Sequence, residues 1–245
     1  MNTRNKTGLM LTVIAALGAA SAAVAGGDAP AMVAHASAAV EHVNADKAFA
    51  YGLTHDNGTV VPRDYPKALY WYRQAAEAGH AEAMNRLGIF YAMGYGVPQD
   101  YVAAVEWYRR GAENGSASAM NNIATAYFNG LGVPRDYALA VHWLEPLTRA
   151  GDPRAQNKLA LLYEYGLGVP KDRAAAFELL KQAAAQQYAP AMANLGAMYA
   201  DPESPRYDEK RGAELIEEAL KIGLPEGMRQ VMTNQLGSVQ ARLDW

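Results

Sequence analysis

A period of 36 residues runs through most of the chain and restricts its fold more than any other feature. Asp64, Asp100, Asp136, Asp172 and Asp208 are each separated by 36 residues. The same shift aligns columns of proline, valine, tryptophan, alanine, glycine and tyrosine. A fixed period of this size is the signature of repeat proteins, in which each unit packs on its neighbours. So many columns in register over five units exclude coincidence.

Each repeat is predicted to contain two helices. In the second unit, Ala83, Leu87 and Tyr91 recur at i, i+4 and i+8, which places one apolar stripe along a helix. Gly94 ends that helix, because glycine adopts the left-handed conformation that closes helices. Asp100 then offers an N-cap oxygen to the second helix. No alternating run of β-branched residues predicts a strand.

The segment from Ala83 to Trp107 resembles the Sel1-like repeat, a relative of the tetratricopeptide repeat. It reads A-x-x-x-L-G-x-x-Y-x-x-G-x-G-V-P-x-D-Y-x-x-A-x-x-W, and five such units cover about residues 45 to 223. The resemblance implies an all-α fold. We expect an α-solenoid, a right-handed superhelix of helix pairs, with about five 36-residue repeats plus end caps.

The two ends of the array depart from the repeat. The first unit has His55 in the tyrosine column, and the fifth has residues 201–206 in place of the glycine loop. Terminal units of a solenoid are usually atypical, because each has only one neighbour. We therefore expect an N-terminal linker and cap helix over residues 26–44, the repeats over 45–223, and a C-terminal capping helix over 224–245.

The first 25 residues have the layout of a secretory signal peptide. Arg4 and Lys6 form a positive segment, residues 8–20 are apolar, and residues 23–25 (Ala-Val-Ala) form a small-x-small cleavage box. An apolar stretch of this length is too short to cross about 30 Å of hydrocarbon. We expect cleavage after Ala25, a periplasmic or secreted protein, and no membrane insertion after cleavage.

The composition excludes several kinds of site. Lys and Arg number 22 against 25 Asp and Glu, so nothing indicates the clustered positive charge that nucleic acid binding requires. The chain has no cysteine, which rules out a disulfide scaffold, a thiolate metal site and a cysteine nucleophile. We therefore expect no nucleic acid partner.

Motifs that could suggest chemistry are explained by the repeat. Gly94-x-Gly96 follows a predicted helix, whereas a dinucleotide-binding loop follows a strand. The aspartates of the 36-residue column lie about 20 Å apart along a stack of helix pairs, too far to share an ion. No two histidines have the spacing of a zinc-protease helix. We predict no catalytic residue, no metal site and no cofactor, and hence no enzyme.

The candidate binding site is the face of each first helix that lies away from the apolar stripe. In tetratricopeptide-like stacks this face lines the concave groove, and an asparagine amide there can both donate to and accept from a peptide backbone. A solvated polar face, or amides satisfied inside the fold, explains the same pattern equally well. The candidate groove residues are Asn85, Arg86, Phe90, Asn121, Asn122, Asn157, Lys158, Leu162 and Asn194.

The resemblance implies a function in binding rather than catalysis. The leading hypothesis is a non-enzymatic protein that holds another protein or a peptide segment in its concave groove, as an adaptor or regulator. The alternative is a periplasmic immunity protein, an inhibitor that neutralises a secreted toxic effector.

Overall fold

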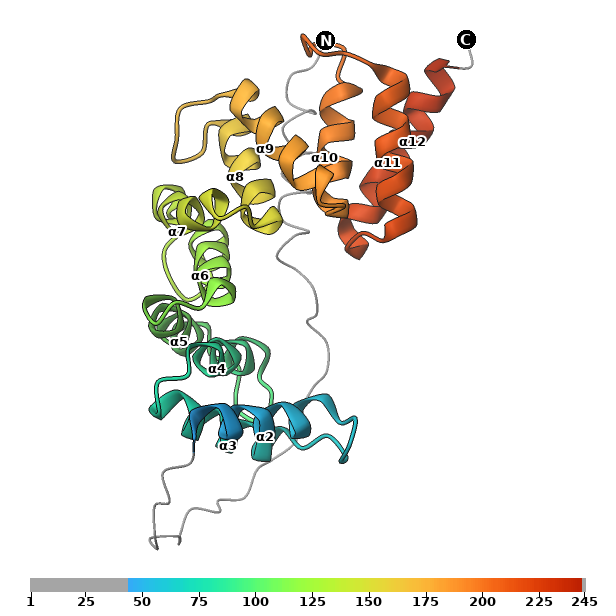
Figure 1. Ribbon diagram of the computed structural model, residues 1–245. Coiled ribbons are helices and arrows are strands. Elements are labelled where there is room, and N and C mark those ends of the chain that lie inside the picture. Colours follow the sequence, from blue (N-terminus) through green and yellow to red (C-terminus); the bar gives the residue numbers. More distant parts are fainter. Residues whose placement is uncertain (1–43, 244–245) are drawn as a thin grey trace, which may run out of the picture. The chain divides into compact units, whose positions relative to one another are not determined.

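The computed structural model describes residues 44–243 of the 245-residue chain. These residues form helices joined by short turns, and no strand occurs among them (Figure 1). The helices are α2 (Ala45–Asn57), α3 (Tyr65–Glu77), α4 (Ala81–Met93), α5 (Tyr101–Glu113), α6 (Ala117–Asn129), α7 (Tyr137–Arg149), α8 (Pro153–Tyr165), α9 (Arg173–Ala185), α10 (Ala189–Tyr199), α11 (Glu209–Ile222) and α12 (Glu226–Leu243).

The helices alternate between two kinds with the period seen in the sequence. The first helices of the repeats, α2, α4, α6, α8 and α10, begin 36 residues apart, and so do the second helices, α3, α5, α7, α9 and α11. The two helices of a repeat pack against each other, as α4 does on α5 and α8 on α9. The prediction of an all-α solenoid built from helix pairs is therefore confirmed.

The aspartate column marks the start of every second helix. Asp64 is the N-cap of α3, and its Oδ1 accepts a hydrogen bond from the Lys67 N–H at 3.0 Å. Asp100 accepts from the N–H groups of Val102 and Ala103 in the same way. Each carboxylate satisfies donors that a helix leaves free in its first turn. The column is thus a set of helix caps, as the sequence predicts.

Small residues let the two helices of a repeat approach closely. A Cβ atom added to Gly88 of α4 would lie 2.4 Å from the Tyr108 ring of α5, and one added to Gly52 of α2 would lie 2.5 Å from the Tyr72 ring of α3. Both distances are far inside van der Waals contact, so a larger side chain would push the pair apart. In these two repeats the tyrosine of the second helix therefore occupies the space that the glycine leaves.

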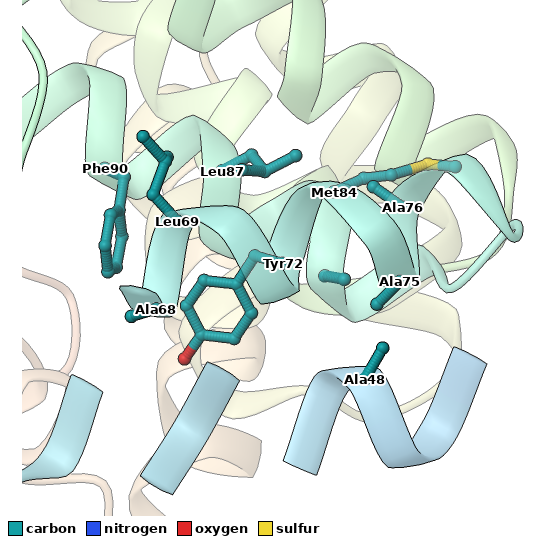
Figure 2. Close-up of a cluster of buried hydrophobic side chains, with 10 residues drawn as sticks. Ala48, Ala68, Leu69, Tyr72, Ala75, Ala76, Met84, Leu87 and Phe90 are labelled. Carbon is teal, nitrogen blue, oxygen red and sulfur yellow. The ribbon is translucent and has the colours of Figure 1, made fainter. Parts of the chain in front are cut away.

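The described residues divide after Met120, within α6, into two compact units. In the unit that ends at Met120, a core cluster surrounds Tyr72, Leu87 and Phe90 (Figure 2). The Tyr72 hydroxyl donates to Asp56 Oδ2 at 2.9 Å. In the unit that begins at Asn121, one cluster gathers around Leu180 and another holds buried methionines of α10 and α12.

The two predicted caps differ in what can be described. The C-terminal segment 224–245 contains α12, which packs on α11 and buries Met228 and Met232. The predicted signal peptide, and the linker and cap helix up to residue 43, lie outside the described residues. Across residues 44–243, no helix is both long enough and apolar enough to cross a membrane.

Candidate partner-binding surface

Six of the nine predicted groove residues are buried. Their side chains are between 0 and 6% exposed, and the set comprises Asn85, Phe90, Asn121, Asn157, Leu162 and Asn194. The expectation that these six face away from the packed interior is therefore wrong. Arg86, Asn122 and Lys158 remain partly accessible.

The physical reason is that a first helix is covered on more than one side. α4 packs against both α3, the second helix of the preceding repeat, and α5, its own second helix. A helix with a single neighbour buries one stripe and exposes the rest. A helix between several neighbours also buries the flanks of that stripe, which is where Asn85 and Phe90 lie.

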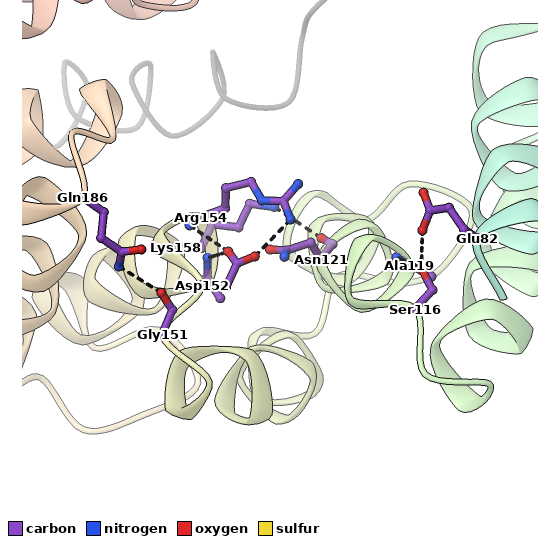
Figure 3. Close-up of polar contacts among 10 residues, drawn as sticks. Glu82, Ser116, Ala119, Asn121, Gly151, Asp152, Arg154, Lys158 and Gln186 are labelled. Carbon is purple, nitrogen blue, oxygen red and sulfur yellow. Dashed lines mark hydrogen bonds and ion pairs between the residues drawn. The ribbon is translucent and has the colours of Figure 1, made fainter. Parts of the chain in front are cut away.

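In the unit that begins at Asn121, polar contacts join neighbouring repeats. Asn194 of α10 donates through Nδ2 to Asn157 Oδ1 of α8 at 2.8 Å. Lys158 of α8 donates to the Asn121 carbonyl of α6 at 3.2 Å (Figure 3). It also donates to Thr125 Oγ1. These contacts therefore join successive first helices, α6 to α8 and α8 to α10. The sequence left open whether these amides bind a partner, face solvent or are hydrogen-bonded inside the fold. The Asn157 and Asn194 side chains are hydrogen-bonded to each other inside the fold.

In the unit that ends at Met120, a carboxylate joins one repeat to the next. Glu82 of α4 accepts from Asn85 Nδ2 through Oε1 and from Ser116 Oγ through Oε2, each at 2.8 Å. Figure 3 shows the contact between Glu82 and Ser116. Ser116 also caps the start of α6, because its hydroxyl accepts from the Ala119 N–H. One carboxylate thus links two repeats and supports the cap between them.

Lys158 is the most perturbed cation among the described residues. Burial and, to a smaller extent, the neighbouring Arg154 guanidinium lower its pKa to about 8, while the Asp152 carboxylate acts in the opposite direction. Asp152 is itself held by Arg154, with Arg154 Nη2 3.0 Å from Asp152 Oδ2. The ammonium therefore sits among fixed partners and gives up part of its hydration.

A narrower stripe than the one expected remains accessible on α4, α6 and α8. On α4 it consists of Glu82, Arg86, Ile89 and Met93, spaced i, i+4, i+7 and i+11. The same columns hold Asn122, Thr125 and Asn129 on α6, and Arg154, Lys158 and Tyr165 on α8. We call these residues the outer stripe. The sequence carried a partial signal for it, since these columns mix charged, polar and apolar residues, whereas the columns of Ala83 and Leu87 stay apolar in every later repeat.

A second exposed feature lies on the first repeat, and the sequence reasoning missed it. Tyr51 of α2 and Tyr70 of α3 are both more than half exposed. Each packs its ring on Trp71, with centroids 5.0 and 5.2 Å apart. Trp71 shares its column with Trp107 and Trp143, which the sequence pattern assigns to packing. Nothing in that column therefore indicated that the first repeat exposes aromatic rings. Within residues 44–243, no three His, Asp or Glu side chains are grouped so as to hold a metal ion.

Comparison with known families and structures agrees with this architecture. The Sel1 repeat family matches five consecutive segments, residues 45–80, 81–116, 117–152, 153–188 and 189–224. No curated protein matches the chain in sequence.

Solved structures share the fold. A Sel1 repeat protein from Oxalobacter formigenes is 25% identical, with a TM-score of 0.69 over 81% of this chain and 88% of that one. A Sel1 repeat protein from Klebsiella pneumoniae is 21% identical, with a TM-score of 0.50 over 80% and 93%. An immunity protein from Pseudomonas aeruginosa is 19% identical, with a TM-score of 0.50 over 82% and 83%. At these identities, the last two show a common fold alone.

Proposed function

The chain belongs to the Sel1 repeat family, and we propose that it is a non-enzymatic adaptor or regulator that binds another protein in the periplasm or outside the cell. Repeat arrays of this kind present one extended surface built from the same columns of successive units. Such a surface suits an extended segment or a protruding loop of a partner. The proposal assigns this role to the outer stripe.

The observation that carries the proposal is the mixed chemistry of the outer stripe at fixed helical spacing. Lys158 donates to Thr125, so the stripes of α6 and α8 lie side by side. Arg86 of α4 reaches Asp56 of α2, with Arg86 Nη1 3.7 Å from Asp56 Oδ2. One partner segment can contact polar side chains on adjacent helices at the same time. Repeat surfaces gain affinity from several weak contacts in this way.

The composition of the stripe favours a partner that offers hydrogen-bond acceptors. Arg154 and Lys158 are cations and Asn122 carries an amide, so α6 and α8 present mainly donors. Backbone carbonyls and carboxylates of an extended peptide match such a surface. Of the nine candidate groove residues, Arg86, Asn122 and Lys158 are proposed to contact the partner. The buried six are proposed to hold the first helices that present those contacts.

A triple substitution on accessible positions tests the proposal. The mature chain with Asn122→Ala, Asn129→Ala and Arg154→Ala should keep its fold, because the changed side chains are accessible at least in part, and single changes at such positions cost about 0.5 kcal/mol or less. Partners are first captured from envelope extract on the parent chain and purified. We expect the triple variant to bind the purified partner at least about tenfold more weakly, since each lost contact contributes about 1 kcal/mol.

The matched control changes exposed positions on second helices. Glu106→Ala, Glu145→Ala and Lys181→Ala lie on α5, α7 and α9 and leave the outer stripe intact. This control should bind the partner with the affinity of the parent chain. Equal affinity of the parent and the outer-stripe variant would contradict the proposal, and a selective loss in the control would move the site to the second helices.

The immunity hypothesis draws on fold likeness alone. The immunity protein from Pseudomonas aeruginosa is 19% identical to this chain, so its function does not transfer with its fold. The same capture experiment separates the hypotheses. A captured partner with a toxic activity that falls on binding would favour the inhibitor, whereas a partner that keeps its activity would favour the adaptor.

We also propose that the protein is exported to the periplasm or out of the cell. Export rests on the predicted cleavage after Ala25, which lies outside the described residues. N-terminal sequencing of the protein from the periplasm or the medium should begin at Gly26. Recovery of an uncleaved chain from the cytoplasm alone would contradict both the cleavage and the location.

A further inference from the structure

The first repeat exposes a face that every later repeat covers. Tyr51 of α2 is 53% exposed, whereas the residues of its column in α4, α6, α8 and α10 are 0 to 4% exposed, namely Leu87, Ile123, Leu159 and Leu195. One turn earlier, Lys47 is exposed, whereas the alanines of its column are fully buried, namely Ala83, Ala119, Ala155 and Ala191. We call the surface formed by Lys47, Tyr51 and Trp71 the end face.

The covering element in later repeats is the second helix of the preceding repeat. α3 packs on α4, α7 on α8 and α9 on α10. The contact is close, since a Cβ atom added to Gly111 of α5 would lie 2.9 Å from the Ala119 Cβ. Among the described residues, no helix precedes α2 to cover the end face in this way.

The segment before α2 carries the pattern of such a helix. A shift of 36 residues places Asp28 in the column of the N-cap Asp64 and Pro30 in the column of Pro66, the second residue of α3. The buried columns of α3 (Ala68, Leu69, Tyr72, Ala75 and Ala76) are occupied in this segment by Met32, Val33, Ala36, Ala39 and Val40. An N-cap, an early proline and apolar residues in the buried columns are the features that form α3 itself.

The connection to α2 departs from the pattern in one column. Val43 stands where Gly79, Gly115 and Gly151 adopt φ between +83° and +92°. A β-branched residue avoids that region of backbone space. Val43 is therefore the one residue of the segment that does not suit the turn seen between later repeats.

We propose that residues 29–41 form a helix that docks on the end face, in the position that α3 takes on α4. Ala39 then lies against Lys47, as Gly111 lies against Ala119, and the apolar residues of the segment cover Tyr51. Only residues 42–44 separate this helix from α2, so docking within the chain is favoured over a free partner by the short tether. The docked helix gives the array its N-terminal cap, which a solenoid needs to shield its first apolar face.

A pair of introduced cysteines tests the register, because the chain has none of its own. In the mature chain, Ala39→Cys with Lys47→Cys places two thiols where the proposal predicts adjacent Cβ atoms, within the range that a disulfide spans. The control is Ser37→Cys with Lys47→Cys, because Ser37 falls in the column of the exposed Arg73. Both loops are short and of similar length, so their closure entropies are nearly equal.

The readout is the fraction of intramolecular disulfide in a glutathione redox buffer. We expect the Ala39 pair to show an effective thiol concentration about tenfold or more above the Ser37 pair. Equal values would mean that the segment samples all orientations, and the proposal would be overturned. Disulfide-linked dimers in place of the intramolecular bond would assign the end face to a second copy, which also overturns it.

Hydrogen exchange supplies an independent measurement. In the parent chain, amides of residues 33–41 should exchange about tenfold or more slowly than an unstructured peptide. Tyr51→Ser should remove that protection and leave the protection of α8 unchanged. Val102→Ser, on an exposed position of α5, should leave both unchanged. Exchange at unstructured rates in the parent chain would overturn the proposal, as would protection that Tyr51→Ser does not change.

Discussion

The first helices α2 and α4 occupy the same place in consecutive repeats, yet they bury different amounts of their surfaces. Leu87 of α4 is fully buried, whereas Tyr51, one period earlier, is more than half exposed. The local sequence forms a helix in both places, with an N-cap before α2 and another before α4. What differs is the set of neighbouring helices, since α4 follows α3 and no described helix precedes α2. In a repeat array, burial is thus decided by the number of neighbours as much as by the pattern along one helix.

The largest expected effect contrasts these two positions directly. Leu87→Ala should lower the free energy of unfolding by about 2–5 kcal/mol, because it leaves a cavity in a packed cluster. Tyr51→Ala should cost less, about 1–2 kcal/mol, because the described residues leave this ring 53% exposed and only the proposed helix of residues 29–41 covers it. Denaturant titrations of both variants provide the comparison. Equal losses would show that the end face is as tightly packed as the core.

An intermediate effect is expected at the buried amides. Asn157→Ala removes the acceptor of the Asn194 amide and should cost about 1–3 kcal/mol, since a buried donor loses its partner. Asn122 occupies the place in the preceding repeat that Lys158, the residue after Asn157, occupies in its own. Its side chain is partly accessible, so Asn122→Ala should cost about 0.5 kcal/mol. A double variant, Asn157→Ala with Asn194→Ala, should cost less than the sum of the single changes, because the two amides share one bond. Strict additivity would contradict the inter-repeat link.

The smallest expected effect is a pH dependence from Lys158. Its pKa falls from 10.5 to about 8 on folding, so between these values the unfolded chain binds a proton that the folded chain does not. The contribution of this group to stability therefore rises with pH through that window and is lost as pH falls through about 8. Because part of the side chain stays accessible, we expect a change of less than about 1 kcal/mol.

Lys158→Met isolates this contribution. The free energies of unfolding of the parent and the variant are measured by chemical denaturation at about pH 7.5, 9 and 10.5, which span the two pKa values. The parent should gain stability relative to the variant as the pH rises through this range. Titrations of other groups, including the tyrosines, are common to both proteins and cancel in that difference. A difference that stays constant over this range would mean that the Lys158 ammonium is fully hydrated in the folded chain.

The sequence predicted the parts of the fold that depend on local chemistry. The period, the helix pairs and the aspartate caps follow from residues a few positions apart, and the structure has all three. The candidate groove failed at Asn85 and Phe90 because their burial depends on helices from neighbouring repeats. A helical pattern read on one element assigns the most apolar face to the core, but it cannot say how far burial extends around the helix. Comparing columns between repeats would have shown that the Phe90 column stays apolar from α4 to α10, whereas the Arg86 column holds only polar residues.

The polar links between repeats also limit how such a chain can change by gain or loss of whole units. Each junction has its own pair, with Glu82 and Ser116 at one, Lys158 and Thr125 at another, and Asn157 and Asn194 at a third. Loss of residues 117–152 by recombination would keep the period but set Lys158 opposite Ile89, which holds the place of Thr125 one repeat earlier. A partly buried amine would then face a side chain that accepts no hydrogen bond. The units share a common length, yet they are not interchangeable parts, so a change in their order along the chain would carry a cost in stability.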